Sequence, residues 1–300
     1  MSKLVSVIIP TYSRASYIVR AIDSVLSQTY NNIEIIVVDD NGEGTEHQKE
    51  TENLLIQYIS ERKITYLKHD VNRNGSAARN TGIRVSHGDY ITFLDDDDEL
   101  LMSKIERQVE ALEKNNGYDG AYCGFQIIKN GKILKSVMPT EKGNLQYGLL
   151  TLRWNIGTGS NPMFRRSVFD DIGLFDESFI RHQDIEFMVR FFRNHKIISV
   201  EDILINRYID SRLNAVSYKK LLSVKEKFLE TFKSDIESYP PSSQNTIYRN
   251  QYSDVACHAI MGKDYKVAFK LYKMANSYRL LSLRIIAKAI AYGFLNRQVE

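Results

Sequence analysis

Short apolar runs alternate with segments of helical periodicity through the first third of the chain. Runs rich in valine and isoleucine predict buried strands at Leu4–Ile9, Ile33–Val38, Ile64–Leu67 and Tyr90–Leu94. Helical spacing of apolar residues predicts helices at Ile18–Leu26, Ser76–Ser86 and Ile105–Leu112. Strands that alternate with helices are typical of βαβ units. We therefore expect an α/β fold with a mainly parallel sheet.

The pattern changes after residue 120. Two apolar runs flank Asn130-Gly131, the preferred turn of a β-hairpin, which predicts paired strands at Tyr122–Ile128 and Lys132–Val137. Farther along, Phe164–Phe169 and Asp184–Asn194 look helical at least in part, and Ile203–Ile209 looks like a strand. Pro240-Pro241 and Gly262 divide the last part of the chain into helices. We expect one domain over residues 1–210 and a helical region over residues 211–300.

Composition is that of a soluble globular protein. The chain has 300 residues, of which 43% are hydrophobic and 26% charged, and no window approaches the length of a membrane span. Its first apolar run ends at Pro10, so we expect no secretory signal. The two cysteines have neither zinc-site nor disulfide spacing, so we expect a cytoplasmic protein without a structural metal.

Charge is distributed unevenly along the chain. The formal net charge is only +3, and we expect no nucleic-acid partner. Residues 211–300 contain 15 basic and 7 acidic residues, whereas residues 1–210 contain 25 basic and 30 acidic ones. Lys266, Lys270 and Lys273 share one helical face, and Arg284 and Lys288 repeat the spacing beside apolar residues. Such a tail could lie on an anionic membrane, face an anionic acceptor, or pack on the first domain or a second subunit. The alternative is a solvated helical tail without a partner.

Polar residues follow three of the predicted strands. They are Pro10-Thr11-Tyr12 after the first, Asp39-Asp40-Asn41 after the second and Asp95-Asp96-Asp97-Asp98 after the fourth. The carboxyl ends of parallel strands meet at one edge of a sheet, where ligands of open α/β sheets bind. A tyrosine can stack on a base, and a carboxylate can accept from a ring N–H or a ribose hydroxyl. This edge therefore predicts a nucleotide pocket.

Four consecutive aspartates repel one another, and a bound cation removes that penalty. If the strand continues, alternation sends Asp95 and Asp97 to one side and Asp96 and Asp98 to the other. Mg²⁺ takes one or two carboxylates and completes its shell with water and substrate phosphates. The cluster therefore fits a metal that bridges a diphosphate. The alternative is a solvated acidic turn that caps the helix from Ser103.

An ordered set of motifs resembles the family 2 glycosyltransferases, which have the GT-A fold. The set comprises Val7–Tyr12, Ile35–Asp40, Gly75–Gly82, Phe93–Asp98, Met163–Arg166 and Gly173–Glu177. The resemblance covers residues 4–210. It implies a GT-A catalytic domain with a mainly parallel sheet flanked by helices and a smaller, second mixed sheet toward the acceptor side. Residues 1–100 of this domain are expected to bind a nucleotide sugar and residues 101–210 to face the acceptor, followed by the basic helical region.

The resemblance also implies individual roles. Donor-binding positions are matched by Pro10, Thr11, Tyr12, Asp40, Arg79, Asp95 and Asp96. Asp97 matches the direct ligand of a Mn²⁺ or Mg²⁺ cofactor, and Asp39 is expected to support the pocket without direct contact. The catalytic base matches Asp184, which follows Gln183 where the family usually has glutamate. Asp184 could instead be only a first-turn acid of its helix.

The function implied is inverting transfer of a sugar from a nucleotide diphosphate, with a UDP-sugar expected by analogy. The sugar is expected to be a hexose or an N-acetylhexosamine, and the acceptor a hydroxyl of a glycan or lipid-linked molecule in bacterial surface-polysaccharide synthesis. Two alternatives stay open. A sugar-phosphate nucleotidyltransferase would be expected to have a glycine-rich loop after the first strand, where this chain has Pro10-Thr11-Tyr12-Ser13. A non-catalytic nucleotide-sugar-binding protein would be expected to lack Asp97 or Asp184.

Overall fold

The computed structural model describes residues 2–209 and 217–278. The described residues form two compact units. The first unit contains residues 2–146 and 156–209, and the second contains residues 147–155 and 217–278.

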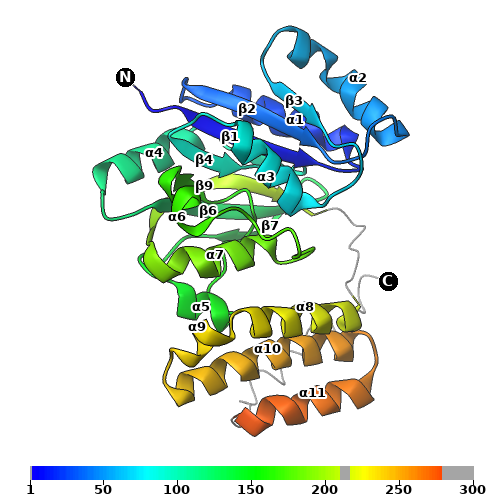
Figure 1. The fold of residues 1–300 in the computed structure, drawn as a ribbon, viewed down its shortest axis with the longest axis vertical. Helices are drawn as coiled ribbons and strands as arrows, with labels where there is room; N and C mark the ends of the chain where they lie inside the picture. The colour runs from blue at the N-terminus through cyan, green and yellow to red at the C-terminus, as the bar shows by residue number, and fades with distance from the viewer. Residues whose placement is uncertain (1, 210–216, 279–300) are drawn as a thin grey trace. The chain divides into compact units, whose positions relative to one another are not determined.

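Four parallel strands make the first half of the main sheet (Figure 1). They are β1 (Val5–Thr11), β2 (Ile33–Asp39), β3 (Thr65–Lys68) and β4 (Tyr90–Phe93), in the order β3-β2-β1-β4. Ile8 of β1 lies opposite Ile36 of β2 and Phe93 of β4. The apolar runs form strands because both faces of this sheet are buried. The predicted parallel α/β sheet is confirmed.

The second half of the sheet is mixed. β8 (Met163–Arg165) lies antiparallel between β4 and β6 (Gly120–Lys129), and β9 (Ile197–Tyr208) runs parallel to β6. β5 (Asp98–Leu100) pairs with β9, and β7 (Lys132–Val137) pairs with β6. The hairpin turn is confirmed, with both Asn130 and Gly131 at positive φ.

Two predictions in this half need correction. The smaller mixed sheet expected on the acceptor side is not separate from the parallel one, because Met163–Arg165 is a strand whose backbone pairs with both β4 and β6. The segment Phe164–Phe169 is helical in part, as predicted, since its first residues belong to this strand. The helix α6 (Ser167–Ile172) begins after it. β9 begins at Ile197, six residues before the predicted start, because its first half pairs with β6.

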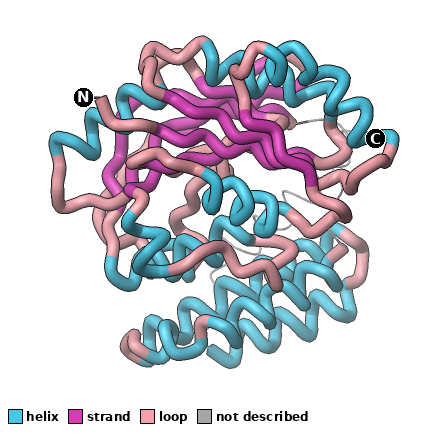
Figure 2. The backbone as a smooth tube through the Cα atoms, turned by 45° about the horizontal axis from the view of Figure 1, so that its top comes forward, coloured by secondary structure: helices cyan, strands magenta, loops and turns pink. Residues whose placement is uncertain are grey.

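Helices cover both faces of the sheet, as Figure 2 shows. Successive side chains of β1 point to opposite faces of the sheet. On one face, Val7 and Ile9 pack in a core with residues of three helices, which are α1 (Ala15–Leu26), α2 (Glu46–Ser60) through Leu55, and α4 (Lys104–Lys114). Ile8 points the other way, toward α3 (Gly75–Val85). A Cβ at Gly82 would lie 2.4 Å from Ile8 Cγ2, so α3 can approach β1 this closely only with glycine there.

The second unit is helical, as predicted for the described part of residues 211–300. Its helices are α8 (Tyr218–Thr231), α9 (Lys233–Glu237), α10 (Pro241–Met261) and α11 (Tyr265–Tyr278), and most of α5 (Gln146–Leu150) belongs to it. Figure 1 shows α8, α10 and α11 side by side, and small apolar residues such as Ala256 and Ala259 fill their core. None of the helices in residues 2–209 and 217–278 has the length and apolar character that a membrane span requires.

Candidate functional site

The carboxyl ends of β1 and β4 meet, as the sequence predicted. Thr11 Oγ1 donates a hydrogen bond to Asp96 Oδ2 at 2.8 Å, and the backbone N–H of Tyr12 lies 3.4 Å from the same oxygen. Pro10 and Thr11 pair in register with Val38 and Asp39 of β2. The Tyr12 side chain is 53% exposed at this edge. The ring is therefore free to stack on a flat ligand.

The four aspartates form a turn, and the strand does not continue through them. β4 ends at Phe93, and the Asp98 N–H donates to the Asp95 carbonyl at 3.0 Å. Asp96 and Asp98 are buried, and Asp98 accepts from Thr158 Oγ1 and Ser160 Oγ, each at 2.6 Å. The side chains of Asp95 and Asp97 stay about one third exposed. Two carboxylates therefore hold the turn together, and two face outward.

Burial disfavours the ionised forms of Asp96, Asp97 and Asp98. It raises the pKa of Asp96 to about 7, with further repulsion from Asp97, and it also raises the pKa of Asp98. The pKa of Asp97 is raised by burial too, although Arg14 opposes that effect. A divalent cation would relieve the repulsion, so the donor set fits Mg²⁺ or Mn²⁺. Over the described residues, no three His, Cys, Asp or Glu side chains are grouped to hold a metal. Phosphate and water would therefore complete the coordination shell.

Two arginines contact the outward aspartates. Arg79 Nη2 of α3 donates to Asp95 Oδ1 at 2.6 Å. Arg14 Nη1 pairs with Asp97 Oδ2 and lies 3.5 Å from Asp96 Oδ1. Sequence reasoning missed Arg14. Its place two residues after Tyr12, directly before α1, is the signal that could have found it.

Asp40 lies in a different environment from the other residues that the sequence predicted to bind a donor. It is buried, and its two oxygens accept from His69 Nδ1 at 2.6 Å and from Asn72 Nδ2, Arg73 N and Asn74 N at 2.8 Å each. These bonds shape the loop that leads into α3. Asp39 is also buried and accepts from Tyr66 and from its neighbour Asn41. Sequence reasoning missed the contribution of His69 and the 72–74 loop.

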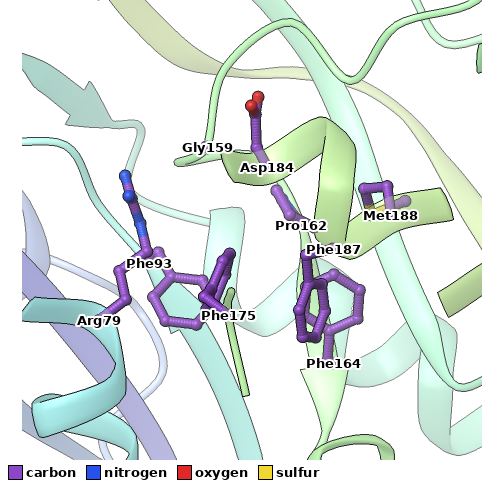
Figure 3. A pocket seen from close by; sticks show the side chains of 9 residues that line it. All are labelled: Arg79, Phe93, Gly159, Pro162, Phe164, Phe175, Asp184, Phe187 and Met188. Atoms are coloured by element: carbon purple, nitrogen blue, oxygen red, sulfur yellow. The ribbon is translucent and has the colours of Figure 1, made fainter. Parts of the chain in front are cut away.

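Asp184 lies in the first turn of α7 (Gln183–Asn194). Gln183 Oε1 accepts from Arg79 Nη1 at 2.9 Å, so Arg79 joins the start of α7 to Asp95. Asp184 is partly buried, and burial raises its pKa while the positive charge of Arg79 opposes that rise. Figure 3 shows the charged ends of Arg79 and Asp184 on the same side of a pocket.

Phenylalanine rings form the floor of this pocket (Figure 3). Phe175 stacks on Phe187 with ring centres 4.5 Å apart, and Phe93 meets Phe175 edge-on at 5.2 Å. Phe164 also packs against Phe187. Glu186, two residues from Asp184, is buried and paired with Arg190. The structure therefore brings Arg79, Asp95 and Asp184 together and keeps Glu186 apart.

Comparisons with known proteins agree on one family. The profile "Glycosyl transferase family 2" matches residues 6–173. An uncharacterised glycosyltransferase of Rickettsia prowazekii is 38% identical over 213 residues, which are 69% of this chain and 64% of that protein. The amylovoran biosynthesis glycosyltransferase AmsB of Erwinia amylovora is 31% identical over 219 residues, 70% of this chain and 71% of that protein.

One further relative carries a fully specified name. The Escherichia coli UDP-Glc:alpha-D-GlcNAc-diphosphoundecaprenol beta-1,3-glucosyltransferase WfgD is 33% identical over 154 residues, 51% of this chain and 57% of that protein. The matched regions span 64%, 33% and 29% of the first three curated relatives, so the chain corresponds to only part of their length.

Among solved structures, residues 1–349 of S. aureus TarS in complex with UDP-GlcNAc superpose with a TM-score of 0.64 at 17% identity. The match covers 95% of this chain and 83% of that one, and it confirms the predicted GT-A fold. Because the family profile spans more than half of the chain and the relatives agree with it, this chain belongs to glycosyl transferase family 2.

Proposed function

We propose that the chain is an inverting glycosyltransferase that moves a sugar from a UDP-sugar to an acceptor hydroxyl. One observation carries the proposal: Arg79 contacts both Asp95 on the aspartate turn and Gln183, the neighbour of Asp184. A single guanidinium thus connects the edge suited to a nucleotide diphosphate with a carboxylate suited to receive a proton. Transfer in one displacement needs both groups at the same anomeric carbon.

The donor pocket in this proposal follows from exposed and buried groups at the strand ends. Tyr12 offers its ring to the base, and Thr11 holds Asp96 beside it. Asp40 acts mainly through the 72–74 loop that it organises, while Arg79 offers positive charge to the diphosphate. UDP is favoured because the TarS complex and the name of WfgD both specify UDP-sugars.

Asp97, with Asp95 beside it, is the residue proposed to hold Mn²⁺ or Mg²⁺. A bound divalent cation would stabilise the negative charge of the departing diphosphate. Both carboxylates face outward from the turn, and both are balanced by an arginine. Asp96 and Asp98 are too deeply buried and too fully hydrogen-bonded to serve as the main ligands.

Asp184 is the proposed general base. It would accept the proton of the acceptor hydroxyl as the oxygen attacks. The positive charge of Arg79 opposes the rise in the Asp184 pKa that burial causes, and so favours the ionised carboxylate. Phenylalanine rings line the pocket below both side chains. The sugar transferred is proposed to be a hexose or N-acetylhexosamine. A glycan or lipid-linked acceptor in polysaccharide synthesis is favoured by the names of AmsB and WfgD.

The experiment that tests this function is a donor and metal screen. Purified protein would be incubated with a panel of nucleotide sugars, with Mn²⁺, with Mg²⁺ and with excess chelator, and release of the nucleotide would be measured. We expect UDP release from a UDP-sugar that requires a divalent cation. The anomeric configuration of the product, read by NMR, should be opposite to that of the donor. Absence of turnover with every donor, or retention of configuration, would contradict the proposal.

The second unit is proposed to contact an anionic membrane through α11. Lys266, Lys270 and Lys273 are exposed on this helix, next to the exposed rings of Tyr265 and Phe269. Aromatic and basic side chains on one face suit the interface of an anionic bilayer. Arg284 and Lys288, which extended the predicted face, lie outside the described residues. Sedimentation with anionic vesicles at low salt tests this, and absence of binding would favour packing on protein.

A further inference from the structure

Three arginines surround the aspartate turn, and they are held in very different ways. Arg79 is 11% exposed and hydrogen-bonded to both Asp95 and Gln183. Arg20 donates to the Asp97 carbonyl at 2.8 Å, and its guanidinium lies 3.7 Å from the centre of the Tyr208 ring. Both are fixed in place by packing as well as by charge.

Arg14 is held more loosely. Its side chain is 50% exposed, and its guanidinium covers the outward carboxylate of Asp97 and the near oxygen of Asp96. An ion pair with this much exposure is worth little free energy, because water competes for both partners. The long side chain can therefore leave the carboxylate at small cost.

The position of Arg14 conflicts with metal binding. The Asp97 oxygen that accepts from Arg14 is the outward carboxylate proposed to bind the cation, and one oxygen face cannot hold both positive groups closely. A cation placed beside a fixed guanidinium would also be repelled. Removing the guanidinium entirely, however, would leave the donor diphosphate with one positive group fewer.

We propose that Arg14 is a displaceable counter-ion. It neutralises Asp97 while the site holds no cation, yields that carboxylate when metal and donor enter, and then donates to the diphosphate. This inference rests on the proposed function, and it adds a coupling: metal alone binds weakly because Arg14 must leave, whereas metal with a nucleotide binds tightly because Arg14 gains a new partner.

The test compares two affinities in the wild type and in Arg14→Ala. The first is the affinity for Mn²⁺ without nucleotide, followed by the free-ion signal in electron paramagnetic resonance. The second is the affinity for UDP at saturating Mn²⁺, followed by calorimetry. We expect Arg14→Ala to bind Mn²⁺ about two- to fivefold tighter, the range of a half-exposed ion pair. We expect it to bind UDP about tenfold weaker or worse, because a charge-assisted hydrogen bond is lost.

Arg207 provides a matched control. This residue lies on β9, and its positive charge also acts on Asp97. Among the described residues, however, Arg207 and Asp97 form neither a hydrogen bond nor an ion pair with each other. Arg207→Ala should raise Mn²⁺ affinity less than Arg14→Ala does and should leave UDP affinity unchanged. Arg14→Lys keeps the charge and should bind Mn²⁺ as weakly as the wild type.

The proposal predicts that Arg14→Ala binds Mn²⁺ more tightly and UDP more weakly than the wild type, and a merely structural role would not produce this combination. If Arg14→Ala weakens both ligands, Arg14 merely supports the turn, and the proposal is wrong. If Mn²⁺ affinity is unchanged or equals that of Arg207→Ala, no displacement occurs. Failure of the proposed function would look different, because the wild type would then not bind UDP in the presence of Mn²⁺. The Mn²⁺ affinities of the wild type and Arg14→Ala, measured without nucleotide, would still show whether Arg14 competes with the cation.

Discussion

Glu186 and Arg190, one helical turn apart in α7, form a two-pronged ion pair with N–O distances of 2.5 and 2.8 Å. Glu186 is only 2% exposed. Arg190 also donates to the carbonyls of Ile172 and Leu174, at 2.6 and 2.8 Å. Glu186 therefore orients the guanidinium of Arg190, which fixes α7 against the preceding segment. Its carboxylate is not placed to take a proton from a substrate.

Asp184→Asn should lose most of its turnover and little of its donor affinity. Removing a general base typically lowers kcat about 10²- to 10⁴-fold. The affinity for UDP should stay within a few-fold of wild type, because Asp184 is proposed to touch the acceptor. Steady-state kinetics and UDP calorimetry check this. An Asp184→Asn variant with near-normal kcat would show that the base lies elsewhere.

Glu186→Gln is the matched control on the same helix. It should keep much more of kcat than Asp184→Asn, and it should unfold at a lower temperature. An amide can still accept one hydrogen bond, so a loss of about 1–3 kcal/mol is expected from weakening the buried pair. Thermal unfolding measures the loss. If Glu186→Gln were inactive yet normally stable, the assignment of the base to Asp184 would be wrong.

Asp97 and Asp98 should respond differently to alanine, although they are neighbours. Asp97→Ala should abolish turnover with little change in stability, because its carboxylate faces outward. Asp98→Ala should lower the unfolding temperature, because Thr158 and Ser160 lose their shared acceptor. Excess chelator should reproduce the loss of activity in Asp97→Ala. Full turnover of wild type in chelator would contradict the role proposed for the metal.

Gln183→Glu should shift the pH profile of the reaction. A carboxylate at this position would sit next to Arg79 and offset the positive charge that now opposes the rise in the Asp184 pKa. The pKa of Asp184 would then rise further. Because a base must be deprotonated to act, the acid limb of kcat should move to higher pH. Gln183→Met, which is uncharged, should not move it upward in the same way, and an unchanged limb in Gln183→Glu would contradict this coupling.

Lys104 should make stability depend on pH in the alkaline range. It is completely buried, its ammonium donates to Thr92 Oγ1 at 2.7 Å, and burial lowers its pKa from 10.5 to about 8. Between these values the unfolded chain binds more protons, so this group makes the free energy of unfolding rise with pH. The full rise would be roughly 3 kcal/mol. Urea unfolding of wild type and Lys104→Met from pH 7 to pH 10 measures it, and equal slopes would refute it.

Gly82→Ala should destabilise the protein because α3 lies directly on β1. The added Cβ would fall 2.4 Å from Ile8 Cγ2, and such overpacking typically costs about 1–3 kcal/mol. Gly117→Ala is the control, since its Cβ would meet nothing within 4 Å. Ile8→Ala removes Cγ2 and Cγ1, the two atoms nearest the added Cβ, so Gly82→Ala should cost less stability in an Ile8→Ala background than in the wild type. Equal unfolding temperatures for the two alanine variants would show that the backbone can shift freely here.

Sequence periodicity predicted the parallel strands because their residues are buried on both faces and read as unbroken apolar runs. It failed for Met163–Arg165, a three-residue strand that exists only because β4 and β6 offer open edges on both sides. It also missed α2, in which Gln48, Thr51 and Leu55 are the buried residues, because only one of these three side chains is strongly apolar. Pairing with neighbouring strands made Met163–Arg165 a strand, and the polar character of its buried face hid α2 from the analysis of apolar spacing.

The residues of the candidate site that belong to short sequence motifs could be predicted. Contacts between segments that are distant in the sequence could not. Asp95–Asp98 pointed to a metal, but the turn geometry that buries Asp96 and Asp98 depends on Thr11, Thr158 and Ser160. The sequence predicted that Asp96 and Asp98 would face one side and Asp95 and Asp97 the other because a strand alternates its side chains. The strand ends at Phe93, so these hydrogen bonds in the turn, and not strand alternation, bury Asp96 and Asp98. The two-pronged role of Arg79 likewise needed the placement of α7.

The phenylalanine floor beneath Asp184 and Arg79 has an electrical consequence. Hydrocarbon rings polarise far less than water, so the field of a charge above them is not screened from below. Field lines from both charged ends therefore concentrate on the side of the pocket away from the rings. A change such as Phe187→Ala that admitted water beneath Asp184 and Arg79 would weaken this field without altering any charge.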